Sequence, residues 1–232
     1  ATTIPHFTIT EECDVTDLCD FRTHLKAPLS IVALFSYAVC RSLQVFPTLN
    51  MTYDDKNNHF VKHEAIHLGI AAHANEGLLV PVMFGAHDHT IIQMQDFLTT
   101  METNVTNQSF TPKELKGSTF TISSLGKLGA LSATPIINYP EVAILSLHCI
   151  QQRPRYINNK LTQRAVMNIS LSLDHRAIDG YAAASFLHHL KQLIETLDFE
   201  FIKKPSQQFS KMFGLNLVNY IKKDVRSKKK NK

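Results

Sequence analysis

A strand that ends on a polar turn and leads into a helix is the most constraining feature of this sequence. Apolar side chains occupy every second position across residues 166–174: Met167, Ile169, Leu171 and Leu173. That alternation is typical of a half-buried β-strand. The polar stretch Asp174-His175-Arg176-Ala177-Ile178-Asp179-Gly180 follows, and apolar residues then recur at helical spacing from about 181 to 197. The segment therefore predicts a strand and a helix joined by a short polar turn.

Weaker patterns elsewhere predict the rest of the domain. Expected strands are residues 4–15, 118–124 and 142–147, with two more between 58 and 84 joined at Asn75-Glu76-Gly77. Expected helices begin after the capping residues Thr16, Ser30 and Thr90. Hairpins and crossovers are mixed along the chain, so we expect an α/β fold with a mixed sheet covered by helices.

Charge divides the 232 residues into a domain at 1–202 and a basic tail at 203–232. The tail has ten Lys or Arg and one acid, which gives it a net charge of +9. Because the whole chain has a net charge of +4, residues 1–202 carry −5. This distribution argues against a basic face for nucleic acid. Apolar residues at helical spacing between Ser206 and Ile221 predict an amphipathic helix in the tail.

Two further features bear on the compartment. No run of 18 apolar residues occurs, so we expect no membrane-spanning helix. The four cysteines are scattered and form no CxxC pair, which indicates reduced thiols: Cys13, Cys19, Cys40 and Cys149. We expect the protein in the cytoplasm or the mitochondrial matrix.

The polar turn holds the candidate catalytic residues. His175 shares the strand parity of Leu171 and Leu173, so we expect it on the covered side of the sheet and Asp174 on the opposite side. A buried neutral imidazole is a good general base near pH 7. Asp179 follows four residues later, and Gly180 permits a sharp turn. The simpler alternative is that Asp179 caps the helix and His175 is a satisfied core histidine.

The turn resembles the active-site signature of the dihydrolipoamide acyltransferases, the catalytic cores of 2-oxoacid dehydrogenase complexes. The resemblance covers most of residues 4–200 and includes several further blocks in the family's order: residues 4–6, 14–16, 21–22, 46–50, 69–71, 77–82, 119–126, 134–138 and 140–145. It implies a trimeric fold like that of chloramphenicol acetyltransferase. Met83-Phe84-Gly85 departs from the family, which often has a lysine after Pro81-Val82.

The resemblance implies acyl transfer between a lipoyl-lysine thioester and the thiol of coenzyme A. His175 would remove the thiol proton, and a hydroxyl would stabilise the oxyanion. The family's hydroxyl maps to Ser123, with Ser124 as the near competitor. In relatives the aspartate at the position of Asp179 meets an arginine of the first helix, here Arg22.

The implied cofactors are coenzyme A as a substrate and a lipoyl group on a separate or missing lipoyl domain, with no metal. His59, His63 and His67 share strand parity, but no clear set of carboxylate or thiolate ligands accompanies them. Implied partners are the lipoyl domain, the decarboxylase, dihydrolipoamide dehydrogenase and further copies of the chain, as a trimer and as a cubic or dodecahedral core.

The sequence leaves alternatives for the acyl group that is transferred and for the class of activity. Arg153-Pro154 and residues 166–170 favour a branched-chain acyl group slightly over acetyl. One alternative is an acetyltransferase of the same fold with another acceptor. The other is a non-catalytic core or tethering subunit, against which the presence of His175 argues.

Overall fold

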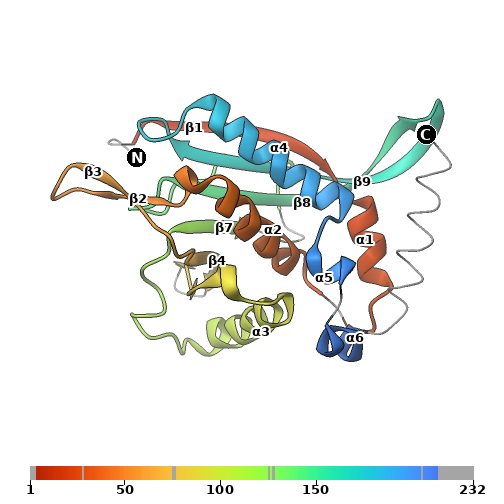
Figure 1. The fold of residues 1–232 in the computed structure, drawn as a ribbon, viewed down its shortest axis with the longest axis horizontal. Coiled ribbons are helices and arrows are strands. Elements are labelled where there is room, and N and C mark those ends of the chain that lie inside the picture. Colours follow the sequence, from red (N-terminus) through yellow and green to blue (C-terminus); the bar gives the residue numbers. More distant parts are fainter. Residues whose placement is uncertain are drawn as a thin grey trace.

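A seven-stranded mixed sheet organises the molecule (Figure 1). The computed structural model describes residues 4–213 except 28, 75–76, 125, 127–128 and 205. The strands are β1 (His6–Asp14), β4 (Leu68–Ala74), β5 (Gly77–Leu79), β6 (Val82–Met83), β7 (Phe120–Ser124), β8 (Ala143–Ile157) and β9 (Lys160–Asp174). Their order is β1-β9-β8-β7-β4-β5, with β6 beside β4. β4, β7 and β8 run parallel, whereas β1, β9 and β8 pair antiparallel. The α/β class with a mixed sheet is confirmed.

Two helices, α2 and α4, lie across one face of this sheet (Figure 1). The helices are α1 (Thr16–Thr23), α2 (Ile31–Val45), α3 (Ile91–Asn107), α4 (Gly180–Thr196), α5 (Glu200–Lys203) and α6 (Gln207–Phe213), with 3₁₀ turns η1 (Pro47–Leu49) and η2 (Ala86–Asp88). The rings of Phe186 in α4 and Phe120 in β7 lie 6.0 Å apart. The apolar stripe predicted for residues 181–197 is the buried face of α4: Ala183, Phe186, Leu187, Leu190 and Ile194.

Capping chemistry sets most helix starts as predicted. Ser30 accepts a hydrogen bond from the Ala33 amide at the start of α2, and Thr90 forms a capping box with Gln93 at the start of α3. The predicted cap at Thr16 is wrong, because Thr16 is the first helical residue and Val15 precedes it. The Thr16 hydroxyl instead accepts from the Ala165 amide of β9 at 2.8 Å. The Thr16 hydroxyl therefore bonds to β9 and not, as the sequence pattern suggested, to the first turn of α1.

The strand pattern is richer than predicted between residues 51 and 84. β2 (Met51–Asp54) and β3 (His59–Lys62) form a separate two-stranded hairpin. The predicted joint at 75–77 does connect β4 and β5, which pair antiparallel. Where two strands were predicted between residues 58 and 84, the structure has four, β3 to β6, and β2 precedes them. Strands of two to four residues are too short to show an alternation of apolar and polar residues in the sequence.

β8 and β9 also extend well beyond the predicted strands at 142–147 and 166–174. Both run to 15 residues and pair as a long hairpin. Asn158 and Asn159 connect them with φ values of 50° and 62°. Two consecutive left-handed residues suit a tight hairpin turn, and asparagine tolerates that conformation well. The polar residues of this extension hide its alternation in the sequence.

A crossing segment, residues 129–138, covers the sheet face opposite the helices. Its backbone bonds to three strands: the Cys149 amide donates to the Ala130 carbonyl, the Ala133 amide to His148 Nε2, and the Ile137 amide to His6 Nε2. Asn168 of β9 donates to the Leu131 carbonyl. The segment therefore covers the part of this face formed by β1, β8 and β9.

The start of the basic tail folds onto the domain. Ser206 caps α6 by accepting from the Phe209 amide at 3.1 Å. Phe209 is buried, and its ring lies 5.4 Å from that of Phe201. The remainder of the predicted tail helix, up to Ile221, and the final basic run lie outside the described residues. Within the described chain, no helix is both long enough and apolar enough to cross a bilayer.

Candidate active site

The polar turn, residues 174–180, is closed by local hydrogen bonds. The Asp174 carbonyl accepts from the amides of Ala177 and Ile178, each at 3.0 Å. The His175 amide donates to the Pro5 carbonyl at 3.0 Å, which ties the turn to the segment before β1. The imidazole of His175 lies 5.1 Å from the Phe7 ring in an edge-on arrangement. These contacts hold His175 at the end of β9 on a well-defined backbone.

The sides of the sheet predicted for Asp174 and His175 are correct, but the burial predicted for His175 is wrong. His175 is exposed, whereas Asp174 is only 1% exposed. His175 does lie on the side of Phe7 and Leu173, as its parity predicted, but α4 starts beyond it and leaves the imidazole uncovered. Asp174 points to the other face, where Arg176 covers it with a 2.6 Å ion pair. Strand parity gives the side of a residue but not the cover on that side.

Asp179 caps α4, in line with the simpler alternative. Its carboxylate accepts from the Ala182 amide at 2.8 Å. Arg22 lies in α1 and its Nε donates to the Leu29 carbonyl at 2.6 Å. The implied pair of Asp179 and Arg22 is therefore absent from the described ion pairs, because each side chain is engaged by a nearby backbone group. Gly180 is the first residue of α4, as the predicted turn into the helix requires.

Ser123 and Ser124 end β7 and point to opposite faces of the sheet. Alternation places Ser124 with Phe120 and Ile122 on the helix face, and Ser123 on the other. The Ser124 hydroxyl accepts from the Gly126 amide at 3.3 Å. Within the described part of the chain, the Ser123 hydroxyl has no hydrogen-bond partner. Both hydroxyls keep a hydrogen to donate, so the two serines differ in the face of the sheet to which they point.

His175 and Ser123 lie far apart along the strand direction, with Ser123 at the end of β7 and His175 beyond the level of its start. Ser123 pairs with Ser146 of β8, which pairs with Ser170 of β9, five residues before His175. Five residues along a strand and two strand spacings across it separate the two residues by on the order of 20 Å. A single chain therefore cannot bring both side chains to one reacting carbonyl.

A buried polar cluster next to β7 was not predicted from the sequence. The Glu141 carboxylate accepts from the Ser118 hydroxyl at 2.5 Å, the Thr121 hydroxyl at 2.7 Å and the Asn138 amide at 2.9 Å. Burial raises the pKa of Glu141 to about 7, against the lowering effect of these donors. The cluster ties the end of the crossing segment to β7. A lone acid at the start of an apolar run, Glu141-Val142-Ala143-Ile144-Leu145, is the signal that could have indicated it.

The histidines that share strand parity do not converge. His63 Nε2 bonds to the Thr52 hydroxyl at 2.7 Å, while His67 Nδ1 accepts from the Gly85 amide at 3.0 Å. Burial lowers the pKa of both imidazoles. No set of three or more metal-ligating side chains occurs among the residues the structure describes.

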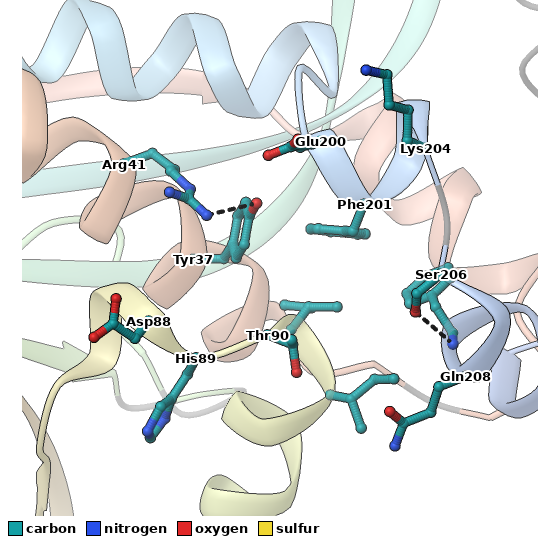
Figure 2. Close-up of a pocket in the computed structure, with 13 residues that line it drawn as sticks. Tyr37, Arg41, Asp88, His89, Thr90, Glu200, Phe201, Lys204, Ser206 and Gln208 are labelled. Atoms are coloured by element: carbon teal, nitrogen blue, oxygen red, sulfur yellow. Dashed lines mark hydrogen bonds between the residues drawn. The ribbon is translucent and has the colours of Figure 1, made fainter.

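A pocket of about 270 Å³ lies between α2, the start of α3, α5 and α6 (Figure 2). Tyr37 and Arg41 line one side of it, and Arg41 donates to the Tyr37 hydroxyl at 3.3 Å. None of its lining residues belongs to the polar turn or to β7. We therefore place the candidate site at His175 and Ser123, the residues that the family resemblance assigns to proton transfer and to the oxyanion, and not in this pocket.

Known proteins are similar to this chain in both sequence and fold. The family described as 2-oxoacid dehydrogenases acyltransferase (catalytic domain) matches residues 1–202. The lipoamide acyltransferase component of the branched-chain alpha-keto acid dehydrogenase complex of Pseudomonas aeruginosa is 37% identical over 199 residues. The dihydrolipoyllysine-residue acetyltransferase component of the Bacillus subtilis pyruvate dehydrogenase complex is 34% identical. Each match covers 83% of this chain but only 46% of the Pseudomonas relative and 45% of the Bacillus relative, so the chain spans about half the length of these relatives.

Solved structures give the same result. Azotobacter vinelandii dihydrolipoamide acetyltransferase and the cubic core of the pyruvate dehydrogenase multienzyme complex both match with a TM-score of 0.80 and 30% identity, over 84% of each chain. Chloramphenicol acetyltransferase matches with a TM-score of 0.62 at 15% identity, covering 82% of this chain and 89% of that one. The last match concerns the fold alone, and it confirms the predicted chloramphenicol-acetyltransferase-like architecture.

Proposed function

The chain belongs to the 2-oxoacid dehydrogenase acyltransferases, and from this membership we propose that it transfers an acyl group between a lipoyl-lysine thioester and coenzyme A. The uncommitted imidazole of His175 carries the proposal. It is exposed on a turn that the backbone closes, and no described residue hydrogen-bonds to its ring. Such a group can accept a proton from a thiol delivered by a substrate.

His175 acts as the general base in this proposal. It takes the proton of the coenzyme A thiol, whose ordinary pKa of about 8.5 is close enough to that of histidine for one imidazole to supply the thiolate. The thiolate attacks the thioester carbonyl, and the tetrahedral intermediate then expels the dihydrolipoyl sulfur. The imidazolium returns its proton to that sulfur. No covalent intermediate with the protein forms.

Ser123 donates its hydroxyl to the oxyanion of the tetrahedral intermediate. Two facts support Ser123 over Ser124: the hydroxyl of the family's motif maps to Ser123, and Ser123 faces away from the helices. Because His175 lies on the order of 20 Å away in the same chain by strand spacing, the two residues must come from different subunits. We propose a trimer in which each site takes His175 from one chain and Ser123 from its neighbour.

The larger assembly and its partners follow from the same family membership. We propose that trimers join into a larger core, as in the cubic core to which the chain is similar. A lipoyl domain, the decarboxylase and dihydrolipoamide dehydrogenase would be its partners. A branched-chain acyl group is slightly favoured over acetyl, and the relatives at 37% and 34% identity include both types.

One assay tests the activity and the acyl group together. Acetyl-, isobutyryl- and succinyl-coenzyme A are each offered with dihydrolipoamide, and acetyl-coenzyme A is also offered with chloramphenicol. We expect transfer to dihydrolipoamide only, fastest with isobutyryl, and abolished in His175→Ala. Transfer to chloramphenicol would instead indicate the acetyltransferase alternative. Absence of transfer from all three donors in a correctly assembled protein would indicate the non-catalytic alternative.

A further inference from the structure

Arg176, the residue after His175, is locked to the buried carboxylate of Asp174. Its Nε lies 2.9 Å from Oδ1 and its Nη2 lies 2.6 Å from Oδ2. The Arg176 amide donates to the same Oδ1 at 3.0 Å. A two-point contact of this kind fixes the plane of the guanidinium group as well as its position.

The guanidinium of Arg176 also packs on two aromatic rings of the β2–β3 hairpin. It lies 4.7 Å from the centroid of Tyr53 in β2 and 5.8 Å from that of Phe60 in β3. The two rings contact each other at 5.1 Å. A cation over aromatic faces at these distances is attracted to them. The hairpin, which is not part of the main sheet, is thereby attached to the polar turn.

The attachment matters because His175 has little else to orient it. Its ring contacts Phe7, and its backbone amide is bonded to Pro5. The position of the imidazole therefore depends on the backbone of the turn, on which Asp174 and Arg176 are its immediate neighbours. A displacement of about 1 Å in a catalytic group can reduce the rate roughly 10²-fold.

We propose that Tyr53 and Phe60 are positioning residues for His175, acting through Arg176. The two rings hold the guanidinium against the Asp174 carboxylate, and this pair keeps the turn in the conformation that presents the imidazole. The inference rests on the proposed function for the role of His175 as the base. The geometry of the hairpin and the turn does not depend on that function.

The first test compares three tyrosine variants. Tyr53→Leu should lower kcat about tenfold while the KM for coenzyme A changes less than twofold, because a misplaced base slows the chemical step. Tyr53→Phe keeps the ring face and should retain wild-type kcat. Tyr156 is 78% exposed on the β8–β9 hairpin, so Tyr156→Leu is the matched control and should have no effect. Phe60→Leu removes the second ring independently, in case Tyr53→Leu fails to fold.

A double-mutant cycle tests the route through Arg176. In the Arg176→Gln background, Tyr53→Leu should cause little further loss of kcat, since the group on which the ring acts is already gone. Full additivity of the two losses, or an unchanged kcat in both Tyr53→Leu and Phe60→Leu, would overturn the proposal.

A spectroscopic measurement separates this inference from the proposed activity. The imidazole ¹H–¹⁵N signals of His175 are identified by their loss in His175→Ala. They should shift or broaden in Tyr53→Leu and stay unchanged in Tyr53→Phe and Tyr156→Leu. Unchanged signals in Tyr53→Leu would refute the positioning role even if the enzyme is active. A shift in a protein without acyltransferase activity would leave the coupling intact and refute only the function.

Discussion

The ends of β9 and β7 carry the two proposed catalytic side chains and are constructed differently. At the end of β9, His175 sits on a turn that is closed by backbone hydrogen bonds and braced by Arg176, and Asp179 at the end of the turn caps α4. At the end of β7, Ser123 has a hydroxyl that no described residue engages, and its strand is tied down through Thr121 to the buried Glu141. The turn after β9 holds the backbone of His175 firmly. At the end of β7, the Ser123 hydroxyl can donate a hydrogen bond that no described residue accepts.

This difference is what the proposed arrangement, in which a single chain holds two halves of different sites, would require. A base and an oxyanion donor must both lie within about 3 Å of the reacting atoms. The strand register places one side chain beyond the start of β7 and the other at its end. In the proposed mechanism, another copy of the chain completes each of the two.

The largest effect is expected from the β9 end. His175→Ala should lower the rate of acyl transfer by about 10³-fold or more, because the thiolate then forms without a base. The side chain is exposed, so the melting temperature should stay within a few degrees of that of the wild type. Turnover and thermal melting are measured on the same sample. A folded variant that retains turnover would exclude His175 as the base.

A smaller effect is expected from the β7 end. Ser123→Ala should lower kcat about 10²-fold with little change in the KM for coenzyme A, because the donor acts in the transition state. Ser124→Ala is the matched control, since its hydroxyl bonds to the Gly126 amide and faces the helices. Steady-state kinetics of both variants check this. A larger loss in Ser124→Ala would reverse the assignment of the two serines.

Mixing the two inactive proteins tests whether the ends belong to one site. His175→Ala and Ser123→Ala chains are dissociated, mixed in equal amounts and reassembled. If each site takes one residue from each of two neighbours, random trimers should regain about a quarter of wild-type activity. Each variant reassembled alone is the control. Mixed trimers of confirmed composition that show no more activity than the controls would place both residues in one chain.

The smallest effect is expected from Asp179, whose carboxylate caps α4 at the end of the turn. Asp179→Ala removes the cap of α4 and should lower the free energy of unfolding by about 1 kcal/mol. Asp179→Ser, which can still accept from the Ala182 amide, should recover most of that loss. Denaturant unfolding of Asp179→Ala, Arg22→Gln and the double variant should give additive losses. A clear coupling energy between the two positions would show an ion pair that the structure lacks.

The sequence by itself determined the local features of the domain. The alternation at 167–173 predicted β9, and the recurring apolar residues at 181–197 predicted α4, because the periods of 2 and 3.6 are properties of the backbone. Ser30 and Thr90 were recognisable as caps for the same reason, since a cap bonds only two or three residues ahead. The ordered motifs that resemble the acyltransferases indicated the family. They also singled out His175 and Ser123 as candidate catalytic residues.

Only the tertiary structure decided which groups surround those residues. Alternation gave the side on which Asp174 lies, but Arg176 and a hairpin more than a hundred residues away in sequence determine that it is buried. The cluster around Glu141 and the separation of His175 from Ser123 arise in the same way. Burial, ion pairs and distances across a sheet depend on contacts between segments remote in sequence, and no local period encodes such contacts.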